Sequence, residues 1–178
     1  MKQKILWITR TAVILALLVT LQAVTKPFGQ FVTGSCVNLV LALSVLLSGL
    51  PCGLVVALVS PVLAFLLGIA PQILTVPAIM AGNCIYVLLL RALFAKQLWR
   101  QALSLVCAAV AKFLTLYGIV AGLICGVLAQ QLLDAGLLKT PMLQLLPATF
   151  SWPQLVTALI GGLLATGMLP VLKKAIRG

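Results

Sequence analysis

The sequence predicts an all-α membrane protein, a bundle of six transmembrane helices with both termini in the cytoplasm. Of its 178 residues, 63% are hydrophobic and 7% are charged, and the mean hydropathy is +1.29. A water-soluble domain of this length needs far more polar surface. Apolar runs recur along the chain, most of them near the roughly 20 residues with which a helix crosses about 30 Å of hydrocarbon.

Six apolar segments account for a single membrane domain over residues 1–178. The first begins MKQK and resembles a signal peptide, but it is too long, contains Arg10, and is followed by further apolar segments. The second is short but extends backwards through Val32. We expect spans at about 5–24, 36–50, 52–70, 73–94, 104–132 and 153–172.

The basic residues orient the predicted bundle. With the N-terminus in the cytoplasm, the outer connections contain only Lys26 and Lys139. Eight of the twelve basic residues then gather at the cytoplasmic ends: Lys2, Lys4, Arg91, Lys96, Arg100, Lys173, Lys174 and Arg177. This asymmetry is the positive-inside pattern, and termini on the same side require an even number of spans.

The residue inventory argues against an enzyme, a metal site and a nucleic-acid partner. The chain has no histidine and one acidic residue, Asp134, so metal, triad and paired-carboxylate chemistries lack their components. The five cysteines form no CxxC pair and lie in or beside apolar runs, where buried thiols are expected, although cysteine chemistry at Cys84 stays open. The net charge of +11 is spread between apolar runs instead of forming a patch.

Lys112 is the most informative residue, because it lies within the predicted fifth span. A lysine at membrane depth costs about 2.5 to 3.5 kcal/mol on insertion scales unless it meets a partner, water or a ligand. No apolar segment contains an acidic residue that pairs with it. We therefore expect a ligand to supply the counter-charge or a hydrogen bond. The structural alternative is that the side chain snorkels to an interface.

Other polar residues in or near the spans are candidates for the same binding pocket. Amides in lipid need partners, so they either line a pocket or form hydrogen bonds between helices. The candidate substrate-binding residues beside Lys112 are Thr33, Asn38, Gln72, Asn83, Tyr117 and Trp152.

Two features place the expected pocket at the outer side. The apolar outer connection 133–152, which ends at Trp152, is poorly suited to water and is expected to lie on the interface or fold as a lid. Pro61, Pro71 and Pro77 with Gly68 interrupt the third and fourth spans. Broken backbone at membrane depth is tolerated where it lines a cavity, although a plain kink is an equal alternative.

Small residues mark two faces for close helix packing. Ala12 and Ala16 lie four apart in the first span, and Ala158, Gly162 and Thr166 follow the same spacing in the sixth. Packing within the chain is the default interpretation of both faces. A contact with another subunit is the alternative.

Together these features resemble a family, the substrate-binding S components of energy-coupling factor (ECF) transporters. The resemblance covers nearly the whole chain and rests on size, topology, the Ala12-x-x-x-Ala16 pattern, the stretch GQFVTGSCVN and the run SPVLAFLLGIAP…PAIMAGN. It implies a vitamin- or micronutrient-binding subunit of an importer in a bacterial or archaeal cell membrane. Ala12 and Ala16 would dock on a membrane coupling subunit that two cytoplasmic ATPases drive.

Two further functions stay open from the sequence. One is a membrane structural or assembly protein whose polar residues only hold helices together. The other is an autonomous carrier or channel, although the spans lack the carboxylates and histidines that proton relays usually use. The absence of a GxxxxGK[ST] phosphate loop agrees with a transport subunit that has no nucleotide site of its own.

Overall fold

The computed structural model describes residues 2–69 and 72–177, and this part of the chain is helical without strands. The α-helices are α1 (Lys2–Thr25), α2 (Gln30–Ser48), α3 (Leu50–Leu66), α4 (Val76–Leu93), α5 (Leu98–Tyr117), α6 (Ala129–Asp134), α7 (Met142–Thr149) and α8 (Trp152–Arg177). Two 3-10 turns, η1 (Lys26–Phe28) and η2 (Ile73–Thr75), precede α2 and α4, and the π-helical η3 (Gly118–Val127) continues α5.

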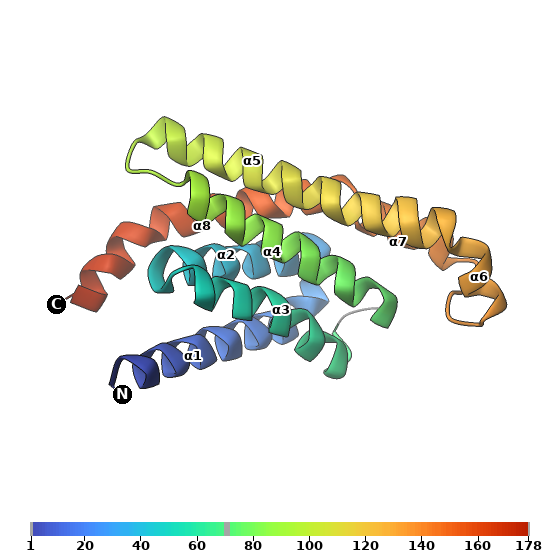
Figure 1. Ribbon diagram of the computed structural model, residues 1–178, viewed down its shortest axis with the longest axis horizontal. Helices are drawn as coiled ribbons and strands as arrows, with labels where there is room; N and C mark the ends of the chain where they lie inside the picture. The colour runs from blue at the N-terminus through green and yellow to red at the C-terminus, as the bar shows by residue number, and fades with distance from the viewer. Residues whose placement is uncertain (1, 70–71, 178) are drawn as a thin grey trace.

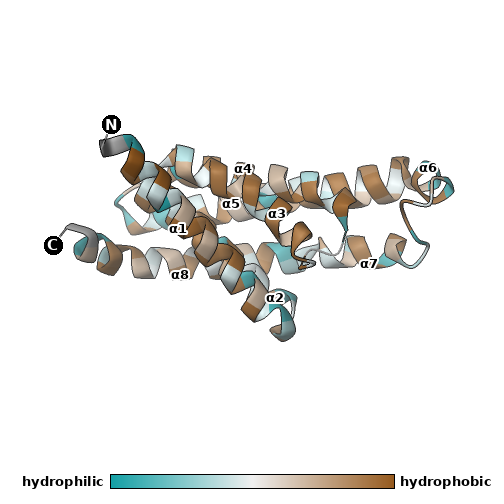
Figure 2. Cartoon of the chain, turned by 90° about the horizontal axis from the view of Figure 1, so that it is seen from below, coloured by the Kyte–Doolittle hydropathy of each residue, from teal (hydrophilic) through white to brown (hydrophobic). Residues whose placement is uncertain are grey.

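The long helices run antiparallel in one bundle. Both ends of the described chain lie at the same end of the bundle, whereas α6 and α7 lie at the opposite end (Figure 1). Hydrophobic residues extend along the helices (Figure 2). Within the described residues, five helical segments are long and apolar enough to cross a membrane: Lys4–Phe28, Gln30–Ser48, Ile73–Leu93, Leu98–Val127 and Met142–Ala175. The chain is therefore a multi-pass helical membrane protein, in which the apolar α3 is a shorter helix of 17 residues.

Several boundaries differ from those predicted. The helix α2 begins at Gln30 rather than near 36, because Gly29 at φ 86° ends η1 and lets a new helix start at once. The connection 133–152, predicted to be an outer loop, contains the helix α7. The predicted third span ended at Ala70, which lies outside the described residues, as does Pro71.

Two apolar clusters form the interior. The larger cluster draws residues from α1, α2, α3, α4, α5 and α8. The smaller cluster is formed at the α6–α7 end by α4, α5, η3 and α7, together with Leu138 and Phe150. The candidate site lies where these clusters meet, since its walls include Val37 beside the larger cluster and Leu116 and Phe150 from the smaller one.

Candidate functional site

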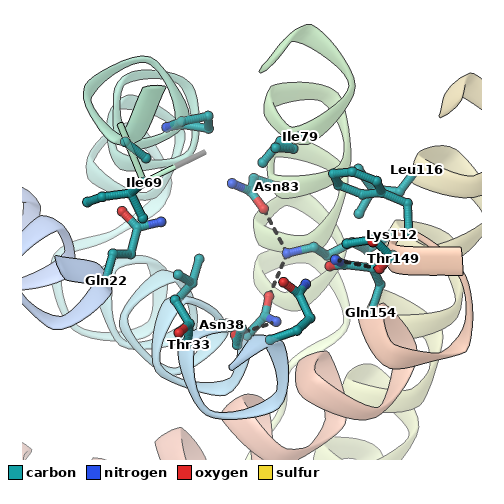
Figure 3. Close-up of a pocket in the computed structure, with 16 residues that line it drawn as sticks. Gln22, Thr33, Asn38, Ile69, Ile79, Asn83, Lys112, Leu116, Thr149 and Gln154 are labelled. Carbon is teal, nitrogen blue, oxygen red and sulfur yellow. Dashed lines mark hydrogen bonds between the residues drawn. The ribbon is translucent and has the colours of Figure 1, made fainter. Parts of the chain in front are cut away.

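The ammonium group of Lys112 on α5 is buried between two other helices. The side chain is 3% exposed, and its Nζ donates to Oδ1 of Asn38 on α2 at 2.6 Å and to Oδ1 of Asn83 on α4 at 2.7 Å (Figure 3). The amine points into the bundle and does not extend to a membrane interface, as the snorkelling alternative required. One ammonium group thus joins three helices.

Close packing between α2 and α8 fixes the position of Asn38. A Cβ atom at Gly161 would lie 2.5 Å from the backbone oxygen of Ser35 and 2.6 Å from Cβ of Asn38, so only glycine permits this approach. Nδ2 of Asn38 donates to the carbonyl oxygen of Gly34 at 2.9 Å and to Oγ1 of Thr157 at 3.4 Å. These bonds leave Oδ1 turned toward Lys112.

A similar close approach between α4 and α5 positions Asn83. The preceding residue, Gly82, packs against Leu116, which lies one helical turn beyond Lys112. Tyr86 follows Asn83 by three residues, and its ring centroid is 5.4 Å from Nζ of Lys112. A ring face at this distance attracts a cation. The buried hydroxyl of Tyr86 donates to the carbonyl oxygen of Ala158 on α8 at 3.0 Å.

The positive charge of this ammonium group has no internal counter-charge. Asp134, the only Asp or Glu in the sequence, is exposed on α6 and accepts a hydrogen bond from Gln130. Two amide oxygens and an aromatic face stabilise the cation, but they are neutral groups. A buried charge is normally paired, so the site favours an anion from outside the chain.

A cavity of about 140 Å³ adjoins Lys112. Its walls include Gln22 near the end of α1 and Gln30 at the start of α2, and these helix ends lie away from the termini (Figure 1). Gln30 is exposed. Its walls come from α1, α2, α3, α4, α5, α7 and α8. The lining residues are Gln22, Gln30, Thr33, Gly34, Val37, Asn38, Pro61, Ala64, Ile69, Ile79, Asn83, Lys112, Leu116, Thr149, Phe150 and Gln154.

Several polar atoms in this wall are free to bind a ligand. Nδ2 of Asn83, Oγ1 of Thr33 and Oε1 of Gln22 are buried without a hydrogen-bond partner in the described part of the chain. Gln22 and Thr33 lie across the cavity from Lys112 (Figure 3). Buried polar atoms usually have partners, so their convergence on one cavity is a sign of a binding site.

The structure brings together four of the seven predicted binding residues, namely Thr33, Asn38, Asn83 and Lys112. The other three lie elsewhere. Gln72 donates through Nε2 to the carbonyl oxygen of Leu137 at 2.7 Å. Tyr117 is 43% exposed and stacks on Phe113, and Trp152 is 61% exposed and packs against Phe31.

For two of these residues, Tyr117 and Trp152, the separation has a simple geometric reason. Five helical positions rotate Tyr117 by about 140° from Lys112, so it faces away from the cavity. Trp152 is the first residue of α8, whereas Gln154, two positions later, faces the cavity. Ala12 and Ala16, the predicted subunit contact, are exposed on α1.

Three glutamines that line the cavity were missed by the sequence reasoning: Gln30, which is exposed at the start of α2, and two that lie within helices. Gln22 lies in the apolar α1 and Gln154 in the first turn of α8. The argument applied to Asn38 and Asn83 would have found both, because an amide in an apolar helix needs a partner. Pro61 was noted as a possible cavity-lining break, and it is buried in this wall.

Residues 2–69 and 72–177 contain no group of three or more Cys, Asp or Glu side chains placed to hold a metal ion. The side chains that line the cavity offer hydrogen bonding and charge pairing by lysine, amide and hydroxyl groups. Comparisons of the chain with protein-family models, with curated proteins and with solved structures find no match.

Proposed function

We propose that the chain is the substrate-binding membrane subunit of an ECF-type importer for a vitamin or a related micronutrient. The cavity beside Lys112 would take up the nutrient from the outer side of the cell membrane. A coupling membrane subunit and two cytoplasmic ATPases would supply the energy for transport.

One observation supports this proposal above the others. A buried ammonium group has two neutral partners, no carboxylate partner from an Asp or Glu side chain, and a cavity on its free side. An anion 4 Å away would gain about 4 kcal/mol at an effective dielectric constant near 20. Ligand binding thus offsets the cost of placing this lysine in a membrane.

The arrangement of the bundle agrees with this role. The cavity lies at the end opposite the termini, and the positive-inside pattern assigns the termini to the cytoplasm. The exposed Ala12 and Ala16 leave a narrow, smooth strip on α1 where a partner helix would approach closely. Six spans, with α3 as the short one, fit the same topology.

A structural role is the second candidate, and a specific observation favours it. The two bonds of Lys112 hold α2, α4 and α5 together, and interhelical hydrogen bonds in membranes each contribute about 0.6 to 2 kcal/mol. In that case the lysine acts as a staple and the cavity needs no ligand.

The Lys112→Met variant separates these roles. It removes a charge whose burial in the membrane costs about 2.5 to 3.5 kcal/mol on insertion scales. It also leaves two buried amide oxygens without a hydrogen-bond donor, which costs about 1 to 3 kcal/mol of stability for each oxygen. These terms nearly cancel, so we expect a folded, monodisperse protein that has lost its ligand. A staple role predicts no bound ligand in either chain, so that Lys112→Met differs from the wild type in stability alone.

Native mass spectrometry of the detergent-solubilised chain, purified from its own host, tests the function directly. We expect a small molecule to be recovered with the wild-type chain and to be absent from Lys112→Met. Copurification with a coupling subunit and two ATPases is the second expected result. Repeated recovery of empty protein that also ignores a panel of vitamins would refute the proposal.

A further inference from the structure

The hydrogen-bond directions around Lys112 restrict what the cavity binds. An ammonium group only donates, so Asn38 and Asn83 must both turn their oxygens toward it. The amide nitrogen of Asn83 then points away from Lys112, and it has no acceptor among the residues that the structure describes. Asn83 is 1% exposed, so water outside the protein does not satisfy this nitrogen.

The ammonium group also has one N–H donor that is not used in these bonds. It has three N–H groups, and within residues 2–69 and 72–177 two of them have hydrogen-bond acceptors. Because Nδ2 of Asn83 belongs to the amide whose oxygen lies 2.7 Å from Nζ, the two free donors are neighbours on one wall. Two adjacent donors, one of them charged, match the two oxygens of a carboxylate.

We propose that the cavity binds a small monocarboxylate, whose two oxygens accept hydrogen bonds from Nζ of Lys112 and Nδ2 of Asn83. This inference rests on the proposed ligand-binding function and names the chemical class of the ligand.

The charge of the wall selects a single negative charge. Lys112 is the one cationic residue that lines the cavity, and none of the lining residues is acidic. A monocarboxylate leaves the occupied site neutral. A phosphate monoester dianion would leave one uncompensated charge in an apolar surrounding, which is costly. A neutral ligand would leave the ammonium group unpaired.

The volume of the cavity and its remaining walls indicate the size and polarity of the rest of the ligand. The cavity of about 140 Å³ is close to the engineered apolar cavities of about 150 Å³ that bind benzene. Apolar atoms make up most of its surface, and the apolar side chains in the wall include Ala64, Ile69, Ile79, Leu116 and Phe150. Gln22 and Thr33, opposite Lys112, offer an unpartnered amide oxygen and hydroxyl to one uncharged polar group. The body is therefore compact, mainly apolar and about the size of one six-membered ring.

Matched pairs of ring compounds test this inference on the full solubilised chain. The probes are benzoate, nicotinate and cyclohexanecarboxylate, each compared with its primary amide at concentrations up to 10 mM by thermal shift. We expect at least one carboxylate to stabilise the chain and its amide to bind at least tenfold more weakly.

Two variants and one control connect the binding to the two donors. Asn83→Asp keeps the oxygen that faces Lys112 but adds an internal counter-charge and removes the free N–H groups. We expect at least a tenfold loss of carboxylate affinity in Asn83→Asp and in Lys112→Met. Gln131→Glu, on the exposed part of α6, adds the same charge outside the cavity and should leave affinity unchanged. Because Asn83→Asp keeps an acceptor for Lys112, we expect it to fold even if Lys112→Met does not.

The outcomes separate the inference from the function on which it rests. Equal binding of acid and amide, no shift with any carboxylate, or full affinity in Asn83→Asp would overturn the monocarboxylate. Recovery of a neutral or dianionic molecule with the purified chain would also overturn it, while the ligand-binding function would stand. If the chain binds a carboxylate through Lys112 but never assembles with a transporter, the monocarboxylate inference stands and the importer function is refuted.

Discussion

Two helices of this protein have faces of small residues, and the fold uses them in opposite ways. On α8, Ala158 and Ala165 are fully buried and the glycines between them contact α2 and α5. On α1, Ala12 and Ala16 are exposed, while Thr11 and Leu18 on the other side of the helix face the bundle.

The difference shows that a face of small residues predicts close helix packing but does not identify the helix that packs there. On α8 the partner is α2, and their contact places Asn38 beside Lys112. The face on α1 has no neighbour among the described residues, and we propose that a second subunit covers it. The face on α8 positions Asn38 in the site, and the face on α1 would contact the coupling subunit. Three substitutions test this division, in order of their expected effect on stability.

Gly161→Ala should have the largest effect. Its Cβ atom would lie 2.5 Å from the backbone oxygen of Ser35, which has no flexible end to move. Separation of α2 and α8 should cost about 3 kcal/mol, the upper part of the range for overpacked cores. The thermal unfolding midpoint of the solubilised chain measures the loss.

The control lies on the same helix. Gly167→Ala places a Cβ atom in open space, so alanine should add up to about 1 kcal/mol through its helix propensity. Equal midpoints for both variants would show that the face on α8 is not tightly packed.

Tyr86→Phe should have an intermediate effect. The substitution removes the bond to the carbonyl oxygen of Ala158, which the small face on α8 makes reachable. The expected loss is about 1 kcal/mol, typical of one hydrogen bond. Tyr117→Phe is the matched control, because Tyr117 is half-exposed and stacks on Phe113. A Tyr117→Phe loss as large as that of Tyr86→Phe would contradict the assignment.

Replacement of both Ala12 and Ala16 by leucine should have the smallest effect on the isolated chain. Exposed positions tolerate substitution within about 0.5 kcal/mol, so the midpoint should hardly move. Copurification with the coupling subunit and uptake of the nutrient should be lost, because two larger side chains prevent a helix from approaching α1. Normal uptake by the double variant would show that this face is not the docking surface.

Part of the candidate site could be predicted from the sequence. Lys112, Asn38 and Asn83 stood out because a polar group is expensive in an apolar helix, wherever its partner lies. The glutamines Gln22 and Gln154 were equally visible but were not considered. The cost of burying a group is a local property, so these residues could be found without knowing their neighbours.

The geometry of the site was not predictable in the same way. Trp152 was expected to line the pocket but points outward, while Gln154 turns inward. Gln72 was expected to bind ligand; it does not line this cavity, and its amide nitrogen donates to the carbonyl oxygen of Leu137. These outcomes depend on the rotation of each helix and the path of each connection, which long-range packing decides.

The sequence by itself determined that the chain is a multi-pass helical membrane protein with a charged group at membrane depth, because hydrophobicity and charge are properties of single residues and short segments. The tertiary structure alone decided that Lys112 meets Asn38 and Asn83 at the wall of a cavity. It also decided which small-residue face is buried. Lys112 and Asn38 are 74 positions apart in the chain, and only the packing of whole helices brings such residues together.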